Sequence, residues 1–376
     1  MYVRITHTES GCYVTGQIEL RVQEGVTITE PAVALEQCED ALGSGMASFD
    51  LTLLDEEILG GQQAPIQVDY YTSEEDALAG VNPIEDYTDY YTTSTTIWAR
   101  VTNPDPNFEE GCYEIVPVEL IVNPLPEIPG LLDEYRLCVD AEGNAIEEEF
   151  GMSSPPVIDT GLSTPAYEFE WYINGTYQPG EIQGYITATQ SGTYTVKIIN
   201  GETRCENEYS TQVYLSSPPI EYRAVTSPAF SGRHSITVLV EGLGDYQYSL
   251  DDGPFQESNY FEPVSPGTHV VTITDKNGCG TVRLEVTIID YPQFFTPNED
   301  GYHDSWNIIG IEAYPTAKIY IFDRYGKLLK QLSPTGSGWD GTYNGRPLPS
   351  NDYWFRVEYE EDGVIKNFRG HITLKR

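Results

Sequence analysis

The sequence predicts an all-β protein in which immunoglobulin-like β-sandwich modules follow one another in an elongated array. Its 376 residues include 34 Gly and 25 Pro but only 3 Met, a composition that favours many short strands joined by turns. Short runs alternate polar and apolar residues, as at 167–172, which is typical of strands with one buried face. Parts of the sequence also recur with an offset of 100 residues, which is the size of one sandwich module.

The repeat sets the first domain boundaries. The triplet Gly-Cys-Tyr at 11–13 recurs at 111–113, and the strand-like segment at 18–22 matches the one at 118–122. Residues 1–26 are therefore predicted to be the last hairpin of a preceding repeat that is truncated here.

Proline-rich joints at 123–126 and 217–219 separate the modules that follow. Such joints are stiff and extended, which suits an elongated array. The predicted modules are β-sandwich repeats at 27–125 and 126–217, a third β repeat at 218–291, and a compact C-terminal β-sandwich of seven strands at 292–376.

The second module has features of an immunoglobulin-like sandwich. Its alternating strand at 167–172 contains a central Trp171, and a late strand follows at 192–196. Cys138 and Cys205 lie on either side of the tryptophan in the sequence. A tryptophan between two cysteines is typical of that architecture.

Cysteines at matching positions of the repeats indicate disulfides. Cys38 and Cys138 lie 100 residues apart, and two sets of pairings fit the spacing. Neighbouring modules would be joined by Cys12–Cys38 and Cys112–Cys138. Alternatively, each module would be closed internally by Cys38–Cys112 and Cys138–Cys205.

We favour the internal pairings. Cys112 opens a strand, which places it about 30 Å from the junction at the end of that strand at ~3.3 Å per residue. Cys38 is expected at the far end of the first strand after the junction, and a disulfide needs Cα atoms within about 7 Å of one another. Under this prediction Cys12 loses its partner to the truncation, and Cys279 has no obvious partner. Regular cysteine spacing in a β array indicates an oxidising, extracellular compartment.

The charge of the chain excludes several classes of partner. The formal net charge is −39, from 59 acidic and 20 basic residues, so the chain repels nucleic acids and anionic membrane surfaces. Residues 1–291 hold 48 acids and 10 bases (net −38), whereas residues 292–376 hold 11 acids and 10 bases (net −1). This asymmetry indicates that the last segment has a different role. No apolar run of about 18 residues occurs, so no transmembrane helix is expected.

The third module has a recognisable order of motifs. The runs YSLDDG at 248–253, PGTHVV at 266–271 and DKNGC at 275–279 follow one another, and their Asp-Gly and Asn-Gly pairs predict hairpin turns. In this order the module resembles the repeat unit of very large bacterial surface adhesins used in gliding motility, of the SprB type.

The C-terminal module carries the most specific pattern. It contains five separated blocks in order: FTPNEDGYHDSW at 295–306, IFDRYGK at 321–327, WDGTYNG at 339–345, LPSNDYWF at 348–355 and FRGHITLKR at 368–376. These blocks are similar to those of the type B sorting domain of the Bacteroidetes type IX secretion system, also called the gliding motility-associated C-terminal domain.

The resemblance implies a secretion signal that folds in the periplasm and directs its passenger to the cell surface. It also implies recognition by outer-membrane components of the type IX system, with a barrel of the PorP/SprF kind as the expected partner. The residues expected to be recognised are Thr296, Pro297, Asn298, Asp300, Gly301 and Asp304 in the opening loop, and Arg369, Gly370, Lys375 and Arg376 at the end of the chain.

Each of these residues also has a purely structural interpretation. Asn and Asp side chains often form hydrogen bonds with the nearby backbone. For any single residue of the opening loop, an Asx-type turn is therefore the simpler interpretation. Lys375 and Arg376 are the better candidates for recognition, because a strand end with free cationic side chains can dock on a charged partner.

A calcium site is a further hypothesis for the opening loop, and no other cofactor is expected. Asn298, Asp300 and Asp304 are oxygen ligands that suit this ion. The fit to an EF-hand loop is poor, because Thr296 takes the first ligand position and Asn307 the twelfth, where Asp and Glu are needed.

The favoured interpretation is a non-enzymatic C-terminal stalk and secretion signal of a large adhesin at the cell surface. The five histidines are scattered, and neither H-E-x-x-H nor G-x-S-x-G occurs, so no catalytic residues are predicted. One alternative is carbohydrate binding through exposed aromatic residues, of which Trp98, Tyr87, Tyr90 and Tyr91 are the candidates. Another is an accessory part of a secreted polysaccharide-degrading enzyme.

Overall fold

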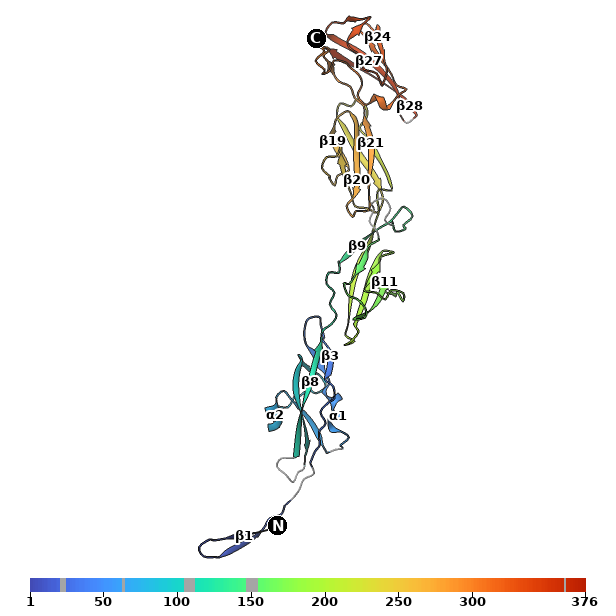
Figure 1. Ribbon diagram of the computed structural model, residues 1–376. Helices are drawn as coiled ribbons and strands as arrows, with labels where there is room; N and C mark the ends of the chain where they lie inside the picture. Colours follow the sequence, from blue (N-terminus) through green and yellow to red (C-terminus); the bar gives the residue numbers. More distant parts are fainter. Residues whose placement is uncertain (21–24, 63–64, 105–111, 147–154, 362) are drawn as a thin grey trace. The chain divides into compact units, whose positions relative to one another are not determined.

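The computed structural model confirms the all-β prediction (Figure 1). Its helical segments are short, and none in the described ranges is long and apolar enough to cross a membrane. They are η1 (Leu51–Leu54), α1 (Asp55–Leu59), α2 (Glu74–Ala79) and η2 (Ile311–Ala313). The structure describes residues 1–20, 25–62, 65–104, 112–146, 155–361 and 363–376.

The chain divides into two compact units. The first holds Met1–Leu131, Asp159–Ile186 and Tyr194–Ser210. The second holds Leu132–Ile158, Thr187–Thr193 and Thr211–Arg376. The strands of the second sandwich are thus shared between the two units.

The N-terminal hairpin and the first sandwich belong to the first unit. The hairpin pairs β1 (Tyr2–Thr6) with β2 (Tyr13–Gln17). The sandwich has a sheet in the order β3 (Leu35–Cys38), β8 (Cys112–Asn123), β7 (Thr95–Asn103), β5 (Gln67–Tyr71), and a pair of β4 (Ala47–Phe49) with β6 (Tyr90–Thr92). Alternation along β7 buries Ile97, Ala99 and Val101 in its core, as expected for a strand with one covered face.

The second sandwich is built around Trp171, which is fully buried and donates from Nε1 to the carbonyl of Gln183 at 2.9 Å. This bears out the expected core position of the tryptophan. The larger sheet has the order β12 (Thr176–Tyr177), β11 (Tyr167–Ile173), β14 (Gly192–Asn200), β15 (Glu206–Ser216), β9 (Glu134–Cys138). The smaller pair is β10 (Val157–Asp159) with β13 (Tyr185–Thr187).

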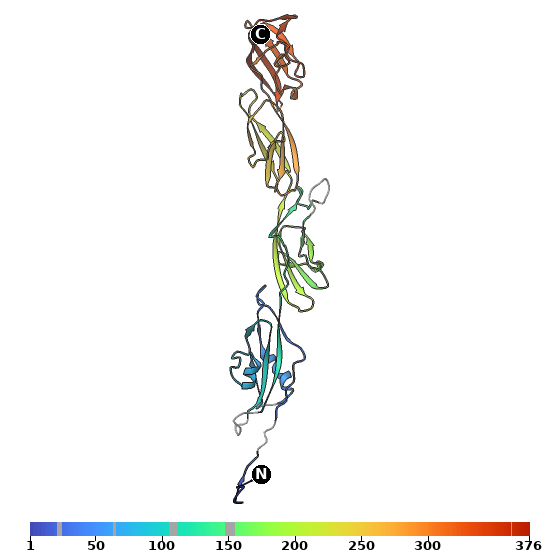
Figure 2. The same cartoon turned by 60° about the vertical axis from the view of Figure 1, so that its left-hand side comes forward.

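The third sandwich consists of two three-stranded sheets, seen from a second direction in Figure 2. One has the order β16 (Glu221–Thr226), β17 (His234–Glu241), β19 (Tyr260–Val264). The other has the order β18 (Tyr246–Leu250), β20 (Gly267–Asp275), β21 (Thr281–Ile288). Its core, which includes Ile236, Val238, Val271 and Ile273, comes from the inward positions of strands in both sheets.

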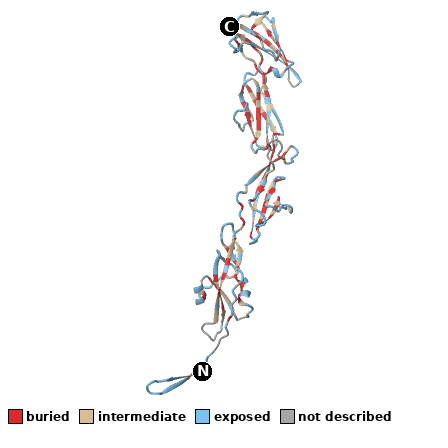
Figure 3. Cartoon of the chain, viewed as in Figure 1, coloured by how far each residue is buried: buried red, intermediate tan, exposed pale blue. Residues whose placement is uncertain are grey.

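The C-terminal domain, residues 292–376, has seven strands within the part that the structure describes. The main sheet has the order β22 (Phe294–Phe295), β28 (Val364–Leu374), β27 (Asn351–Glu361), β23 (Lys318–Phe322), β24 (Leu328–Leu332). A small hairpin pairs β25 (Thr342–Tyr343) with β26 (Arg346–Pro347). Trp306, Trp339, Phe295 and Phe355 are the largest fully buried side chains of its core. The buried positions in Figure 3 follow the same strands.

The predicted disulfide pairings are wrong. Cys38 is bonded to Cys205, and Cys138 is bonded to Cys279. Neither Cys38–Cys112 nor Cys138–Cys205 forms. Each bond that does form joins a cysteine of one predicted module to a cysteine of the next, and each lies within one of the two compact units.

The direction of the first strand explains the error. β3 runs parallel to β8, so that Cys38 pairs in register with Asn123 at the end of that strand. Cys112 lies at the other end of β8, about 36 Å away at ~3.3 Å per residue. Cys38 is therefore at the end where the chain leaves the first sandwich, and not beside Cys112.

The same arrangement recurs in the second sandwich. β9 runs parallel to β15, and Cys138 pairs in register with Ser216. Close to this disulfide, Ser216 Oγ donates to Asp275 Oδ2 at 3.0 Å, and the backbone N–H of Cys279 donates to the same oxygen at 3.1 Å. The cysteine at the end of one sandwich is thus bonded to the last hairpin of the next.

Candidate functional site

The opening loop of the C-terminal domain is organised by Asp304. Its carboxylate accepts the backbone N–H groups of Asn298 at 2.9 Å, Glu299 at 2.7 Å and Gly301 at 2.7 Å. These three bonds lower the pKa of Asp304, the one from Gly301 most strongly, because they favour the charged form of the carboxylate. The loop is closed at its base by the N–H of Thr296, which donates to the carbonyl of His303 at 2.7 Å.

The remaining polar residues of the loop bond to one another. Asn298 Nδ2 donates to Asp300 Oδ2 at 2.8 Å, and the N–H of Tyr302 donates to Asp300 Oδ1 at 2.8 Å. This is the Asx-type turn that was the simpler interpretation. In the described ranges no group of three or more His, Cys, Asp or Glu side chains is arranged to hold a metal ion. Calcium would therefore have to replace the backbone partners of Asp304.

The last residues of the chain lie against this loop. β22 pairs in parallel with the end of β28, and the N–H of Lys375 donates to the carbonyl of Phe295 at 3.0 Å. Arg376 Nη1 lies 3.4 Å from the carbonyl oxygen of Pro297. The opening loop and the terminal Lys375 and Arg376, which lie more than 70 residues apart in the sequence, thus form one edge of the domain.

The expectation that the terminal side chains are free cations is wrong. The Arg376 guanidinium donates from Nε to the carbonyl of Leu348 at 3.1 Å and from Nη2 to that of Gly341 at 3.4 Å. Lys375 Nζ lies 4.0 Å from the centre of the Phe294 ring, a cation–π contact. Both side chains therefore hold the domain together.

Gly370 has a packing role. A Cβ atom at this position would lie 2.6 Å from the ring of Phe355 and 3.1 Å from the hydroxyl of Tyr291. Phe355 is buried and cannot move away. The adjacent Arg369 is exposed on the outer face of the sheet and has no hydrogen bond or ion pair with the described residues.

The C-terminal domain completes its core with a residue of the third sandwich. Phe230 stacks on Phe368 with ring centres 4.2 Å apart and meets Tyr359 edge-on at 6.2 Å. The Phe230 N–H donates to the carbonyl of Ile289 at 3.1 Å, which fixes this loop to the chain as it enters the domain. Tyr291 packs edge-on against Phe355 at 4.7 Å in the same cluster.

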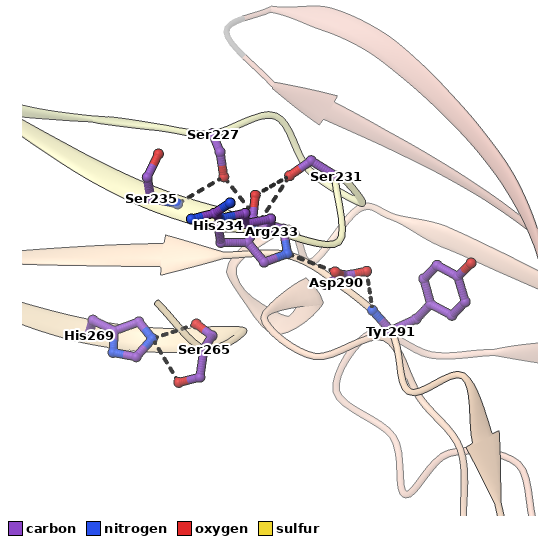
Figure 4. A network of polar contacts seen from close by, with 9 residues as sticks. All are labelled: Ser227, Ser231, Arg233, His234, Ser235, Ser265, His269, Asp290 and Tyr291. Carbon is purple, nitrogen blue, oxygen red and sulfur yellow. Dashed lines mark hydrogen bonds and ion pairs between the residues drawn. The ribbon is translucent and has the colours of Figure 1, made fainter. Parts of the chain in front are cut away.

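A buried histidine–aspartate hydrogen bond lies at the same joint (Figure 4). His234 is 3% exposed and Asp290 is 8% exposed, and their Nε2 and Oδ2 atoms are 2.7 Å apart. His234 Nδ1 lies 3.0 Å from Ser227 Oγ. The backbone of Asp290 bonds to Ile309 of the C-terminal domain, with the Ile309 N–H donating at 2.8 Å. The pair therefore fixes the last segment of the third sandwich to the first part of the C-terminal domain.

This Ser–His–Asp arrangement is not a catalytic site. The His234 imidazole is buried and has both nitrogens engaged, so a substrate cannot reach it. A second such group places His269 between Asp251 Oδ2 at 2.6 Å and the carbonyl of Ser265 at 2.7 Å. The two nitrogens of His269 are therefore engaged by a carboxylate and a backbone carbonyl.

Sequence reasoning missed Phe230, His234 and Asp290. His234 could have been found, because it shares the alternating register of Ile236 and Val238 on β17, and a histidine on a buried face needs a polar partner. Nothing in the sequence around Phe230 distinguishes it from other loop aromatics.

The aromatic residues proposed for carbohydrate binding are mostly covered. Tyr87 and Tyr90 pack against the core of the first sandwich, and Trp98 is half-buried. Tyr91 is 48% exposed, and its hydroxyl donates to Asp40 at 2.7 Å. The four residues therefore do not form an exposed aromatic platform.

Two family models match separate parts of the chain. Residues 34–126 match a Flavobacterium inter-domain disulphide bond domain, and residues 289–374 match the CHU_C type IX secretion signal domain. No curated protein matches the sequence. The chain therefore carries a type IX secretion signal domain at its C-terminal end, which implies export to the cell surface or the extracellular space.

The solved structures that resemble the chain include arrays of immunoglobulin domains and fibronectin(III)-like modules. Immunoglobulin domains 1–4 of Sidekick-1 are 12% identical, with 93% of this chain and 98% of that chain covered and a TM-score of 0.16. The N-terminal eight Ig domains of Down Syndrome Cell Adhesion Molecule are 11% identical, covering 99% and 52%, with a TM-score of 0.28. Fibronectin(III)-like modules of Clostridium thermocellum CbhA are 12% identical, covering 43% and 92%, with a TM-score of 0.22.

Proposed function

We propose that this chain is the C-terminal part of a cell-surface adhesin of gliding bacteria, and that its last domain is the address for type IX export. The match of residues 289–374 to a type IX secretion signal domain carries the export part of the proposal. The order of motifs at 248–279 supports the adhesin part. The β-sandwiches that precede it serve as a stalk between the adhesive part of that protein and the cell surface.

The partner that we propose for the C-terminal domain is an outer-membrane component of the export system, such as a PorP/SprF-like barrel. The charge of the chain supports close docking by this domain. The C-terminal domain has a net charge of −1, whereas residues 1–291 have a net charge of −38. Like-charge repulsion therefore opposes the approach of residues 1–291, but not of the C-terminal domain, to an acidic surface.

The disulfides support an extracellular destination and a load-bearing stalk. Cys38–Cys205 and Cys138–Cys279 each fasten one sandwich to the next, and such bonds persist only in oxidising compartments. A covalent link across a joint limits how far neighbouring sandwiches can separate when the chain is pulled.

The joint between the third sandwich and the C-terminal domain defines the segment to test. Phe230 packs into the core of the C-terminal domain, and His234 pairs with Asp290. We therefore expect residues 218–376 to act as a complete export signal and residues 292–376 to act less efficiently, because the shorter segment exposes the Phe230 site.

The test is a fusion of a signal peptide, a fluorescent reporter and either segment, expressed in a type IX-competent bacterium. Surface reporter, measured by protease accessibility in intact cells, should be highest for residues 218–376. Retention of both fusions in the periplasm would contradict the proposal. Equal surface display by both fusions would support the C-terminal domain as the export signal. It would contradict a contribution of the joint with the third sandwich to export.

A further inference from the structure

The outer face of the C-terminal sheet carries aromatic and cationic side chains in adjacent rows. Alternation along β23, β27 and β28 turns one set of side chains to the core and the other set to this face. In one row Tyr320 pairs with Arg356, and Arg356 pairs with Arg369. The next row consists of Phe322, Trp354 and His371.

A shallow pocket of about 390 Å³ lies on this face. Its lining includes Phe322, Arg324, Trp354, Arg356 and Arg369. Trp354 is 43% exposed, whereas the three tryptophans at 171, 306 and 339 are fully buried. A large aromatic ring held open to solvent between arginines is a feature of recognition surfaces.

The arginines of the pocket are incompletely paired. Arg356 forms an ion pair with Glu358 at 3.2 Å and lies 5.1 Å from the Tyr320 ring centre, but its buried Nε atom has no hydrogen-bond partner among the described residues. Arg324 and Arg369 have no ion pair within the described part of the chain. Their guanidinium groups are therefore available to an anion.

The carboxylate in the pocket lining is already engaged elsewhere. Asp323 Oδ1 accepts the N–H groups of Tyr325 and Lys327, each at 2.9 Å, and so closes the turn between β23 and β24. It forms no ion pair with Arg324 or Arg369 within the described part of the chain. The pocket is a cationic site within a chain whose remaining residues are strongly acidic.

We propose that this pocket docks a short acidic peptide segment of an export protein, with its carboxylates on Arg324 and Arg369 and an adjacent apolar side chain on Trp354. The inference rests on the proposed function and specifies that the export partner of the C-terminal domain presents acidic and apolar side chains. Guanidinium groups bind carboxylates through paired, charge-assisted hydrogen bonds. A short segment fits better than a long polyanion, because the −38 of residues 1–291 repels a long polyanion that extends beyond this face.

The binding test uses the full chain labelled with 15N and an end-blocked octapeptide of alternating Glu and Leu. The indole N–H groups of Trp171, Trp306 and Trp339 bond internally. Trp98 lies on β7 of the first sandwich, so the Trp354 indole signal is the one that reports on the pocket. We expect this signal to shift on titration, and Arg369→Gln to weaken the affinity about tenfold, as for loss of a charge-assisted bond.

Arg346→Gln is the matched control, because it removes the same charge from the same domain outside the pocket. It should leave the affinity within about twofold, since an exposed charge at a distance is screened. The proposal is overturned if Trp354 does not shift, if the two variants weaken binding equally, or if an oligogalacturonate binds through Arg369 and the peptide does not.

A cell experiment separates this inference from the proposed function. The full chain fused to the reporter is compared with its Arg324→Gln/Arg369→Gln and Arg346→Gln variants at equal periplasmic level. Loss of surface display in the first variant alone supports the inference. Equal surface display of all three fusions overturns the inference and leaves the proposed function intact. Failure of the unsubstituted fusion to reach the surface overturns the proposed function. In that case the peptide titration decides the inference.

Discussion

Asp304 shows how one side chain shapes the opening loop of the C-terminal domain. Its two oxygens accept three backbone N–H groups, so the loop depends on the charge of this carboxylate more than on any contact with the core. The sequence identified Asp304, Asn298 and Asp300 as a group but did not distinguish mutual bonding from ligand binding.

Acidification should loosen the loop at a low pH. The three N–H groups hold the pKa of Asp304 below its ordinary value. Its contribution to stability is therefore complete above the unfolded pKa of about 3.9 and is lost as the pH falls through the lower folded pKa. The amide signals of Asn298, Glu299 and Gly301 should shift together, with a midpoint below that of an unperturbed aspartate.

Asp304→Asn provides the control for this titration, because it keeps an acceptor oxygen but removes the charge. The three amides should then show no transition below pH 5. A midpoint at or above about 4 in the unsubstituted chain would contradict the role of Asp304.

His234→Ala should destabilise the joint of the third sandwich and the C-terminal domain. The substitution leaves Asp290 buried without its partner, which costs roughly 2–4 kcal/mol. Hydrogen exchange of β17 and β21 in the full chain measures the loss. The neighbouring Arg233→Ala breaks an ion pair with Glu262 in which Arg233 is 76% exposed, so its effect should stay under about 1 kcal/mol.

Gly370 and Arg376 mark the limit of sequence reasoning for single residues. Both were expected to be recognised by a partner, yet Gly370 makes room for Phe355 and Arg376 bonds to backbone carbonyls. A motif shows that a residue type is required at a position. It does not show whether the requirement comes from packing or from binding.

At the scale of elements, the sequence predicted strands and hairpins well but not their directions. Alternation identifies β11, and the late strand expected at 192–196 lies within β14, because the period of 2 is a local property. Whether β3 runs parallel or antiparallel to β8 depends on the path of the chain between them, which no local pattern records. That one direction decided the disulfide pairing.

The loop that carries Phe230 should stabilise an element of another domain. Phe230→Ala removes a half-buried ring from the cluster with Phe368 and Tyr359, at a cost of about 2–3 kcal/mol. Amide exchange of β27 and β28 in the full chain should accelerate accordingly.

Phe255 supplies the comparison for this variant, since it lies in the same sandwich and is 49% exposed. Phe255→Ala should change the exchange of β27 and β28 by less than about 0.5 kcal/mol. If both variants have equal effects, the ring of Phe230 is not part of the C-terminal core.

At the scale of the whole molecule, the disulfides connect successive sandwiches. Non-reducing peptide mapping should recover Cys38 linked to Cys205 and Cys138 linked to Cys279. Recovery of Cys38 with Cys112 would restore the internal pairing and contradict the parallel arrangement of β3 and β8. The repeat of 100 residues predicted which cysteines occupy equivalent positions. Equivalent positions do not show whether the bonded cysteine lies in the same module or in the next one.

The uneven charge separates two roles within the chain. Residues 1–291 carry nearly all of the net −39, which keeps the sandwiches soluble. The C-terminal domain is almost neutral and has a cationic pocket on one face, so it is the part suited to close contact with a partner.

The most direct test of this division is surface display of a reporter fused to residues 218–376. Protease accessibility in intact cells should show the reporter outside a type IX-competent strain and inside an otherwise identical strain that lacks the outer-membrane translocon. Equal display by both strains, or retention in both, would contradict the assignment of the C-terminal domain as the address for type IX export.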